Sequence, residues 1–481
     1  MRCELNMTKK HHTHDINYTL HFGSVLNSNG IVRFVDHSRN KESTIGLTVD
    51  DKDFRYRVQQ EFPSIVADLI DLAVAIHASD RLAFQNIRQE QSRILVVLPV
   101  RHPELLNAES FRAKLENLLG SATGSRWIFD FQRRADSGRI IERQPLLLQC
   151  APQADEVALW SGGLDALAGL YTRLRTYTEK SFVLFGTGSN EIVYARQEEV
   201  AEQIQSIFPG RSTLYRVPIR FRDSNEHRKN KITRARGVIF TLLGSACAYL
   251  MGRKELCVYE NGIGAINLPY RASAVGLDHS RSVHPLTLLM VSDLVSELIG
   301  ETFRVHNPFL FSTKAEMCQA LAEDRRADLA SLAKSCDSPH RQQPDQCGYC
   351  SSCILRRQAL AASKIEDKTD YVILHGNRSA ADPSVYLRHM LAQVHTLRCL
   401  LNASDRPNLK WEALTRKFTV LDDIVDRGST TENLPTAEMK NRLIELYRNY
   451  VAEWSDVESQ LSVDLLNSCY QQSLGKCWSV A

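Results

Sequence analysis

Residues 155–298 alternate short apolar runs with stretches of helical periodicity. The apolar runs predict strands at 157–160, 181–185, 212–217 and 256–259. The stretches between and after them predict a helix up to about residue 177 and helices at 191–207, 237–251 and 284–298. Strands that alternate with helices pair in parallel through right-handed crossovers. The pattern therefore predicts an α/β fold with a doubly wound parallel sheet.

The chain has 481 residues, and roughly 150 residues per domain suggest about three domains. We expect a disordered tail at 1–15, an N-terminal α/β accessory domain at 16–150, a central domain at 151–365 and a C-terminal helical extension at 366–481. In the accessory domain, strands are predicted at 18–22, 31–35 and 93–100, and helices at 62–78 and 109–119. In the extension, helices are predicted at 385–401 and from about residue 436.

Charge and hydrophobic composition argue against some classes of partner and against a membrane span. A net charge of +3 is too small to argue for a nucleic acid or a membrane surface as partner. The longest uncharged stretch, residues 237–252, is shorter than the roughly 20 apolar residues that a membrane span needs, so we expect a buried helix there. The first ten residues lack the apolar core of a secretory signal, and we expect a cytoplasmic protein. The oligomeric state stays open.

The motif Ser161-Gly162-Gly163-Leu164-Asp165 lies between a predicted strand and a predicted helix. Glycines let the backbone approach a pyrophosphate closely, and a helix N-terminus directs free N–H groups at an anion. Ser161 can donate its hydroxyl to a phosphate oxygen, and Asp165 can hold a Mg²⁺ ion that bridges phosphates. An ordinary Gly-Gly turn is the alternative.

Four cysteines form a second motif: Cys336, Cys347, Cys350 and Cys353. Each Cys-x-x-Cys turn brings two sulfurs to one point, so the four thiolates can surround one tetrahedral Zn²⁺. Four protein ligands leave no position for water, which favours a structural role. An iron–sulfur cluster is the main alternative, and four unrelated buried cysteines are the other.

The Ser-Gly-Gly segment resembles the pyrophosphate-binding loop of the PP-loop ATP pyrophosphatases, whose usual form is S-G-G-x-D-S. Ala166 replaces the last serine, which removes one hydroxyl donor. Combined with the lysine segment around Lys314 and the knot from Cys336 to Arg356, the chain resembles QueC, the 7-cyano-7-deazaguanine synthase family. The resemblance covers residues 155–365. The additions at both ends resemble those of family members in bacterial anti-phage systems (Qat and type IV CBASS).

This resemblance implies a PP-loop type of α/β fold that binds ATP and Mg²⁺. It assigns the pyrophosphate to Ser161, Gly162 and Gly163. It assigns the adenosine to Phe185 and Gly186, which end the second predicted strand.

The resemblance also implies an ATP-dependent ligase or synthase reaction. ATP adenylates the carboxylate of a 7-carboxy-7-deazaguanine, ammonia attacks to give the amide, and a second activation by ATP dehydrates the amide to the nitrile. In defence relatives, the acyl group passes instead to an amine of a partner protein from the same operon. Asp165 is expected to hold Mg²⁺, and Lys314 and Arg236 are expected to stabilise charge as catalytic residues. Glu260 and Asn261 follow another strand at the carboxyl edge of the sheet, where such folds bind ligands.

Two other functions remain open. PP-loop enzymes also modify tRNA, although the small net charge makes nucleic acid an unexpected partner. Ala166 leaves room for a nucleotide sensor without catalysis. His284 precedes a predicted helix and either contacts substrate or caps that helix.

Overall fold

The computed structural model describes residues 16–23, 29–57, 62–83, 92–136, 138–139, 142, 154–188, 191–222, 230, 233–270, 281–337, 344, 346–372, 385–431 and 433–459. The predicted tail at 1–15 lies outside the described residues.

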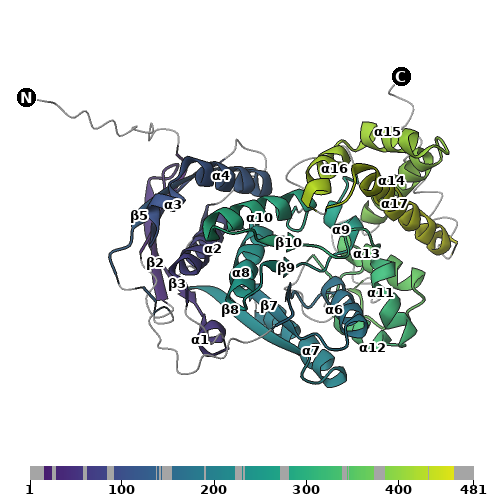
Figure 1. The fold of residues 1–481 in the computed structure, drawn as a ribbon, viewed down its shortest axis with the longest axis horizontal. Coiled ribbons are helices and arrows are strands. Elements are labelled where there is room, and N and C mark those ends of the chain that lie inside the picture. The colour runs from purple at the N-terminus through teal and green to yellow at the C-terminus, as the bar shows by residue number, and fades with distance from the viewer. Residues whose placement is uncertain are drawn as a thin grey trace, which may run out of the picture.

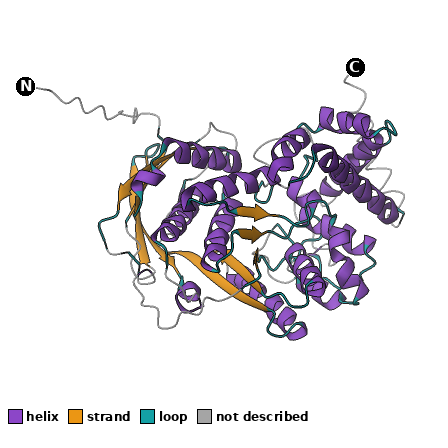
Figure 2. Cartoon of the chain, viewed as in Figure 1, coloured by secondary structure: helices purple, strands orange, loops and turns teal. Residues whose placement is uncertain are grey.

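Ten strands form one mostly parallel sheet in the order β10-β9-β6-β7-β8-β3-β2-β1-β4-β5 (Figures 1 and 2). The strands are β1 (Tyr18–Phe22), β2 (Asn29–Asp36), β3 (Lys41–Val49), β4 (Arg93–Val100), β5 (Arg126–Arg133), β6 (Glu156–Leu159), β7 (Phe182–Gly188), β8 (Ser212–Arg222), β9 (Glu255–Cys257) and β10 (Arg304–His306). From β10 to β8 all neighbours pair in parallel. The predicted parallel sheet is therefore confirmed for this half.

Helices cover both faces of the sheet, because successive side chains of a strand point to opposite faces. In β6, Val157 and Leu159 pack into one core with α2 (Ser64–Leu82), α8 (Arg236–Leu250) and α10 (Pro285–Ile299). Ala158 and Trp160 pack into the other core with α6 (Leu164–Thr176), α7 (Glu191–Ile207), α11 (Lys314–Glu323) and α12 (Ala327–Leu332). The doubly wound arrangement follows from this division.

The N-terminal strands extend the same sheet. Residues 219–222 of the long strand β8 pair with residues 46–49 of β3 in antiparallel fashion, while the first part of β8 pairs with β7. The short helices α1 (Lys52–Arg57) and α3 (Pro103–Leu106) and the longer α4 (Glu109–Thr123) accompany these strands. One hydrophobic core runs through both segments, so residues 16–139 are joined to the central segment by main-chain hydrogen bonds and by packing.

The C-terminal segment is helical, as predicted, and lies at the end of the molecule opposite β5 (Figure 1). It consists of α14 (Val385–Leu401), α15 (Pro407–Lys417), α16 (Val420–Thr431) and α17 (Thr436–Glu458). Its core is shared with the short helix α9 (Gly262–Ile266) and with α13 (Ser351–Ala362). Within the described residues, no helix is both long enough and apolar enough to cross a membrane.

The sheet order creates a topological switch point. β6 lies between β7 and β9, so the chain leaves the carboxyl ends of β6 and β9 toward opposite sides. Open α/β sheets bind ligands in the crevice that opens at such a point. The segments 160–165 and 258–262 border this crevice.

Helix α2 of the N-terminal segment supports the start of α8. The buried Asp80 carboxylate accepts a hydrogen bond from the backbone N–H of Ala235 at 2.9 Å, and Ala235 is the N-cap residue of α8. Its other oxygen has no partner among the described residues. Burial raises the pKa of Asp80 to about 6, against the bond from Ala235 and the charge of Arg234, which lower it.

The raised pKa predicts a pH-dependent stability. A carboxyl whose pKa is higher in the folded state binds its proton more tightly there, so wild type gains stability as the pH falls through about 6 toward the unfolded value. The substitution Asp80→Asn removes this dependence. We expect the free energy of unfolding of wild type, relative to Asp80→Asn, to rise by about 1 kcal/mol between pH 8 and pH 5 in urea titrations. A constant difference over this range would contradict the assignment.

Candidate active site

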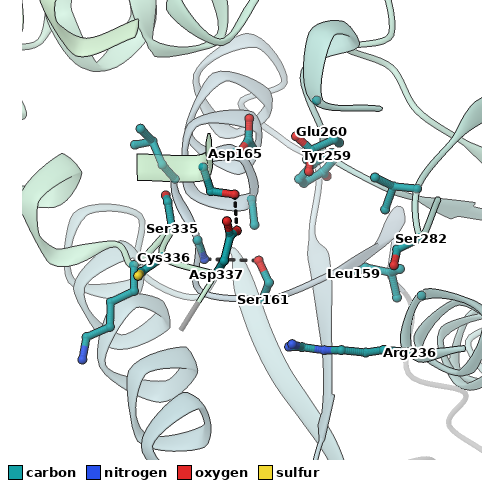
Figure 3. A pocket seen from close by; sticks show the side chains of 18 of the residues that line it. Leu159, Ser161, Asp165, Arg236, Tyr259, Glu260, Ser282, Ser335, Cys336 and Asp337 are labelled. Carbon is teal, nitrogen blue, oxygen red and sulfur yellow. Dashed lines mark hydrogen bonds between the residues drawn. The ribbon is translucent and has the colours of Figure 1, made fainter. Parts of the chain in front are cut away.

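A cavity of about 590 Å³ lies at the switch point. Its walls come from the loop after β6, the segment after β9, the first turns of α8 and α11, and the segment 334–337, in which the cysteine knot begins (Figure 3). Pockets that bind small molecules measure about 300–1,000 Å³. The cavity is therefore large enough for a nucleotide or for a small substrate beside part of one.

The Ser161–Asp165 loop forms the floor of the cavity. The Ser161 hydroxyl accepts a hydrogen bond from the backbone N–H of Gly163 at 3.2 Å, and α6 begins at Leu164. Gly162 has a φ of 72°, and a Cβ atom there would lie 3.2 Å from the Cα of Gln197. Only glycine accepts this combination of positive φ and close approach without strain. The predicted arrangement of strand, glycine loop and helix N-terminus is present.

Four of the predicted residues form one hydrogen-bonded cluster in the cavity wall. The Lys314 ammonium donates to the Asp165 carboxylate at 2.5 Å, and the side chains are 6% and 14% exposed. The Asn261 amide donates to Asp165 at 2.9 Å and to Glu260 at 2.7 Å. The structure thus brings together the ends of β6 and β9 and the start of α11, which are far apart in the sequence.

The charged groups in this cluster shift one another's pKa values. Burial, and after it the charge of the neighbouring Asp165, raises the pKa of Glu260 to about 8, against the charge of Lys314 and the hydrogen bonds of Asn261, which lower it. Burial alone would lower the pKa of Lys314, but the charges of Asp165 and Glu260 outweigh burial and raise it. At neutral pH the cluster therefore contains a positive Lys314 and a mostly neutral Glu260.

Local sequence places Lys314 at this position. Thr313 is the N-cap residue of α11 and accepts a hydrogen bond from the backbone N–H of Glu316 at 3.1 Å. Glu316 in turn accepts one from the backbone N–H of Thr313 at 2.7 Å. This reciprocal capping box fixes the first turn of α11, and Lys314 is its first residue.

Arg236 reaches into the cavity from the first turn of α8, across from Ser335 and Cys336 (Figure 3). Arg236 is exposed to solvent along this wall. Two further cations, Arg196 and Lys334, line the same cavity, and neither was predicted from the sequence as a site residue. Arg196 lies on the regular helix α7 with no motif around it, whereas the proximity of Lys334 to Cys336 was an available signal.

Phe185 and Gly186 are not part of this cavity as the described residues define it. The Phe185 ring is fully buried and stacks on Phe54 of α1 with 5.9 Å between centroids. A Cβ atom at Gly186 would lie 2.6 Å from the Gln197 side-chain oxygen. His284 caps α10: its ring nitrogen accepts a hydrogen bond from the backbone N–H of Leu286 at 3.3 Å.

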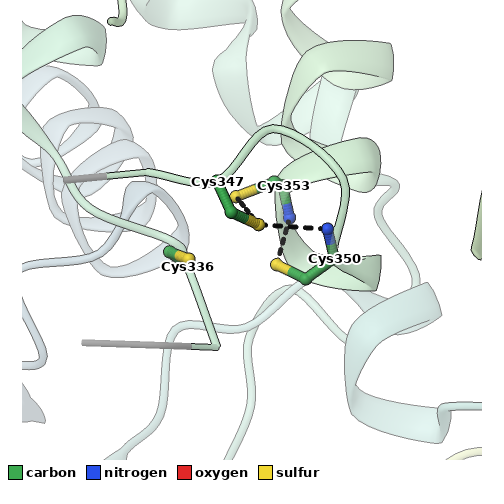
Figure 4. Close-up of side chains that lie close together, drawn as sticks. All are labelled: Cys336, Cys347, Cys350 and Cys353. Atoms are coloured by element: carbon green, nitrogen blue, oxygen red, sulfur yellow. Dashed lines mark hydrogen bonds between the residues drawn. The ribbon is translucent and has the colours of Figure 1, made fainter. Parts of the chain in front are cut away.

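The four cysteines converge at the start of α13 (Figure 4). Their sulfurs all lie within 4.8 Å of one another, and those of Cys347 and Cys353 are 3.8 Å apart. A tetrahedral site with Zn–S bonds of about 2.3 Å places its sulfurs about 3.8 Å apart. The backbone N–H groups of Cys350 and Cys353 donate to the sulfurs of Cys347 and Cys350, at 3.2 and 3.4 Å. The geometry fits one metal ion.

This knot lies directly against the cavity. Asp337 accepts hydrogen bonds from the hydroxyls of Ser351 and Ser352, and all three residues line the cavity wall. The backbone N–H of Lys334, two residues before Cys336, donates to the Gly162 carbonyl at 3.3 Å. Main-chain contact therefore connects the knot segment to the glycine loop.

The fold and the site define an α/β protein with a glycine loop, a buried lysine, further cations and two carboxyl groups at the switch point of its sheet. Residues 282–364 match the family described as Queuosine biosynthesis protein QueC. The matched residues contain Lys314 and all four cysteines, and they begin after the glycine loop. The match supports a QueC-like family for the chain. It indicates an ATP-using enzyme whose function relates to a deazaguanine small molecule.

Removal of the metal should disturb both the knot and the cavity. We expect Cys350→Ser to lower metal affinity by more than about 100-fold, since even changes in the outer shell of a metal site cost 10–100-fold. Because Lys334 bonds the glycine loop, we also expect weaker ATP binding. The exposed Cys399→Ser is the matched control. Elemental analysis and calorimetric ATP titration measure the two effects, and unchanged metal content in Cys350→Ser would refute the site.

Proposed function

We propose that the chain uses ATP to adenylate the carboxylate of a 7-carboxy-7-deazaguanine and passes the acyl group to an amine nitrogen. One observation carries the proposal most directly. The Asp165–Lys314 ion pair joins a residue of the glycine loop to a residue of the QueC-matched segment inside one cavity. A phosphate-binding loop and a buried lysine at its rim are what adenylation needs.

The proposed first step is attack of a substrate carboxylate oxygen on the α-phosphorus of ATP. The new P–O bond forms as the bond to the β-phosphate oxygen breaks, and pyrophosphate leaves. Negative charge builds on the phosphate oxygens during this transfer, and preorganised cations stabilise it. Lys314 and Arg236 are the residues that we assign to this role, with Arg196 and Lys334 as additional cations on the wall.

The glycine loop would bind the pyrophosphate portion. Ser161 would offer its hydroxyl, and Gly162 and Gly163 lie at the N-terminus of α6, where the helix dipole favours an anion. Mg²⁺ would be held by Asp165 and would supply charge neutralisation when bound. The neutral form of Glu260 would avoid repulsion of the phosphates and can donate a hydrogen bond.

In the proposed second step, an amine nitrogen attacks the acyl carbon, and AMP leaves with the electron pair of the C–O bond. The amine loses one proton to solvent or to a carboxylate in the wall. Ammonia as the nucleophile gives the amide, from which a second activation gives the nitrile. An amine of a partner protein gives a conjugate, and this reaction would fit a role in anti-phage defence.

The metal of the knot would be Zn²⁺ with a structural task. Four sulfurs fill its coordination shell, so no position remains for a reacting group. Its contribution would be to hold the segment 334–337 against the glycine loop.

A substitution of the lysine tests the proposal. We expect Lys314→Met to reduce turnover of ATP to AMP and pyrophosphate by about 100-fold or more, because it removes a preorganised charge from the transition state. The exposed Lys368→Met serves as control and should retain wild-type turnover. The measurement is AMP and pyrophosphate release with 7-carboxy-7-deazaguanine as substrate.

Loss of Lys314 also leaves the Asp165 carboxylate without its ion pair, and such a change can unfold a protein. The double variant Asp165→Asn/Lys314→Met removes both charges and should recover the melting temperature while turnover stays low. Full turnover in a folded Lys314→Met variant would reject the assignment. ATP binding without any turnover in wild type would favour a nucleotide sensor instead.

The acceptor is tested by intact-mass spectrometry. The enzyme is incubated with ATP, 7-carboxy-7-deazaguanine and the proteins encoded by neighbouring genes. A mass increase on one partner equal to the deazaguanine acyl group supports conjugation. Formation of the nitrile with unchanged partner masses supports the synthase reaction with ammonia.

A further inference from the structure

One face of α17, the last described helix, contacts the elements that carry the active-site cluster. Leu446, Asn449 and Glu453 are spaced at i, i+3 and i+7, so they lie on the same side of the helix. All three residues pack or bond against the central segment. The helix belongs to the C-terminal segment, beyond the residues that match the QueC family.

Leu446 packs where the chain leaves the cavity after Glu260 and Asn261. A Cβ atom at Gly262 would lie 2.0 Å from the Leu310 carbonyl and 2.6 Å from a Leu446 methyl. The Leu310 backbone carbonyl therefore requires glycine at this position, and the Leu446 methyl of α17 packs into the space that the missing side chain leaves. The contact holds the start of α9, and the Asn261 amide that bonds Asp165 and Glu260 precedes it directly.

Asn449 and Glu453 each form a hydrogen bond with one member of the capping box, Thr313 and Glu316, that flanks Lys314. The Asn449 amide donates to the Glu316 carboxylate at 2.8 Å. The Thr313 hydroxyl donates to the Glu453 carboxylate in a short hydrogen bond. The Thr313 oxygen can therefore still accept the bond from the backbone of α11 while its proton is fixed by α17.

The same Glu453 carboxylate also contacts α13, the helix that begins at the cysteine knot. Its second oxygen accepts a hydrogen bond from the buried Gln358 amide of α13 at 3.1 Å. Helix α13 begins at the knot and contributes Ser351, Ser352 and Leu355 to the cavity wall. The Glu453 carboxylate thus bridges α11, which carries Lys314, and α13, which begins at the cysteine knot.

We propose that Glu453 is a positioning residue for Lys314, which makes α17 a structural part of the active site. Glu453 holds Thr313, and Thr313 fixes the first turn of α11, from which Lys314 reaches Asp165. This inference rests on the proposed function for its kinetic consequence. The C-terminal segment then has a defined task in catalysis in addition to any task in partner binding.

The test uses the isosteric variant Glu453→Gln. Its amide N–H₂ group would face either the Gln358 amide, where the hydrogen bond is lost, or the Thr313 hydroxyl, which could then no longer donate to residue 453. We expect kcat for pyrophosphate release to fall about tenfold while KM for ATP stays within about twofold, because a misplaced transition-state charge affects turnover more than ground-state binding. Glu445→Gln, on the exposed side of the same helix, is the matched control.

A double-mutant cycle separates positioning from general loss of stability. Thr313→Val removes the hydroxyl that Glu453 binds. If both residues act through one hydrogen bond, the effects of Glu453→Gln and Thr313→Val on kcat combine to less than their product. Fully multiplicative effects, or a fall of kcat that only follows the loss of folded protein in thermal melts, would overturn the inference.

Hydrogen exchange gives a readout that does not depend on turnover. Glu453→Gln should accelerate exchange of the backbone amides in the first turn of α11, and Glu445→Gln should not. If wild type turns over no ATP, the proposed reaction fails, but faster exchange in Glu453→Gln still supports the link between α17 and α11. Unchanged exchange in Glu453→Gln would overturn that link whatever the activity.

Discussion

The ion pair between Lys314 and Asp165 is the interaction on which the rest of the site depends. It lies at 2.5 Å in a nearly buried setting, where an unpaired charge is costly. The pair forces the loop after β6 and the start of α11 to meet, although 149 residues separate them in the chain. The cavity between these two segments is therefore lined by charged side chains.

The surrounding structure supports this pair from three directions. Asn261 bonds the carboxylate from the end of β9, the capping box sets the direction of Lys314, and the knot segment holds the glycine loop through Lys334. Glu260 adds a carboxyl that is mostly neutral at pH 7, because burial, and after it the charge of the adjacent Asp165, raises its pKa to about 8. This arrangement supports the proposed binding of an anionic ligand.

Local motifs allowed much of the fold and of the candidate site to be predicted from the sequence. The glycine loop, the cysteine spacing and the alternation of strands and helices each depend on neighbouring residues. Strands β3 and β5 and helices α15 and α16 were not predicted, although Ile45, Leu47 and Val49 in β3 alternate with a period of two. Strand β10 has only three residues, which is too short for a periodic signal.

Contacts between distant segments were beyond sequence reasoning. The placement of Phe185 depends on Phe54, which belongs to the N-terminal segment. The cation Arg196 becomes a cavity residue only through the way α7 packs. The contact of Glu453 with Thr313 depends on how the helix that begins at residue 436 packs against the central segment, which no local pattern predicts.

The central claim is the formation of an acyl adenylate in this cavity, and pyrophosphate exchange measures it most directly. Adenylation is reversible, so labelled pyrophosphate returns to ATP while the adenylate remains bound. The account predicts label in ATP only when 7-carboxy-7-deazaguanine is present. Binding of ATP and of the deazaguanine without any exchange of label would contradict it.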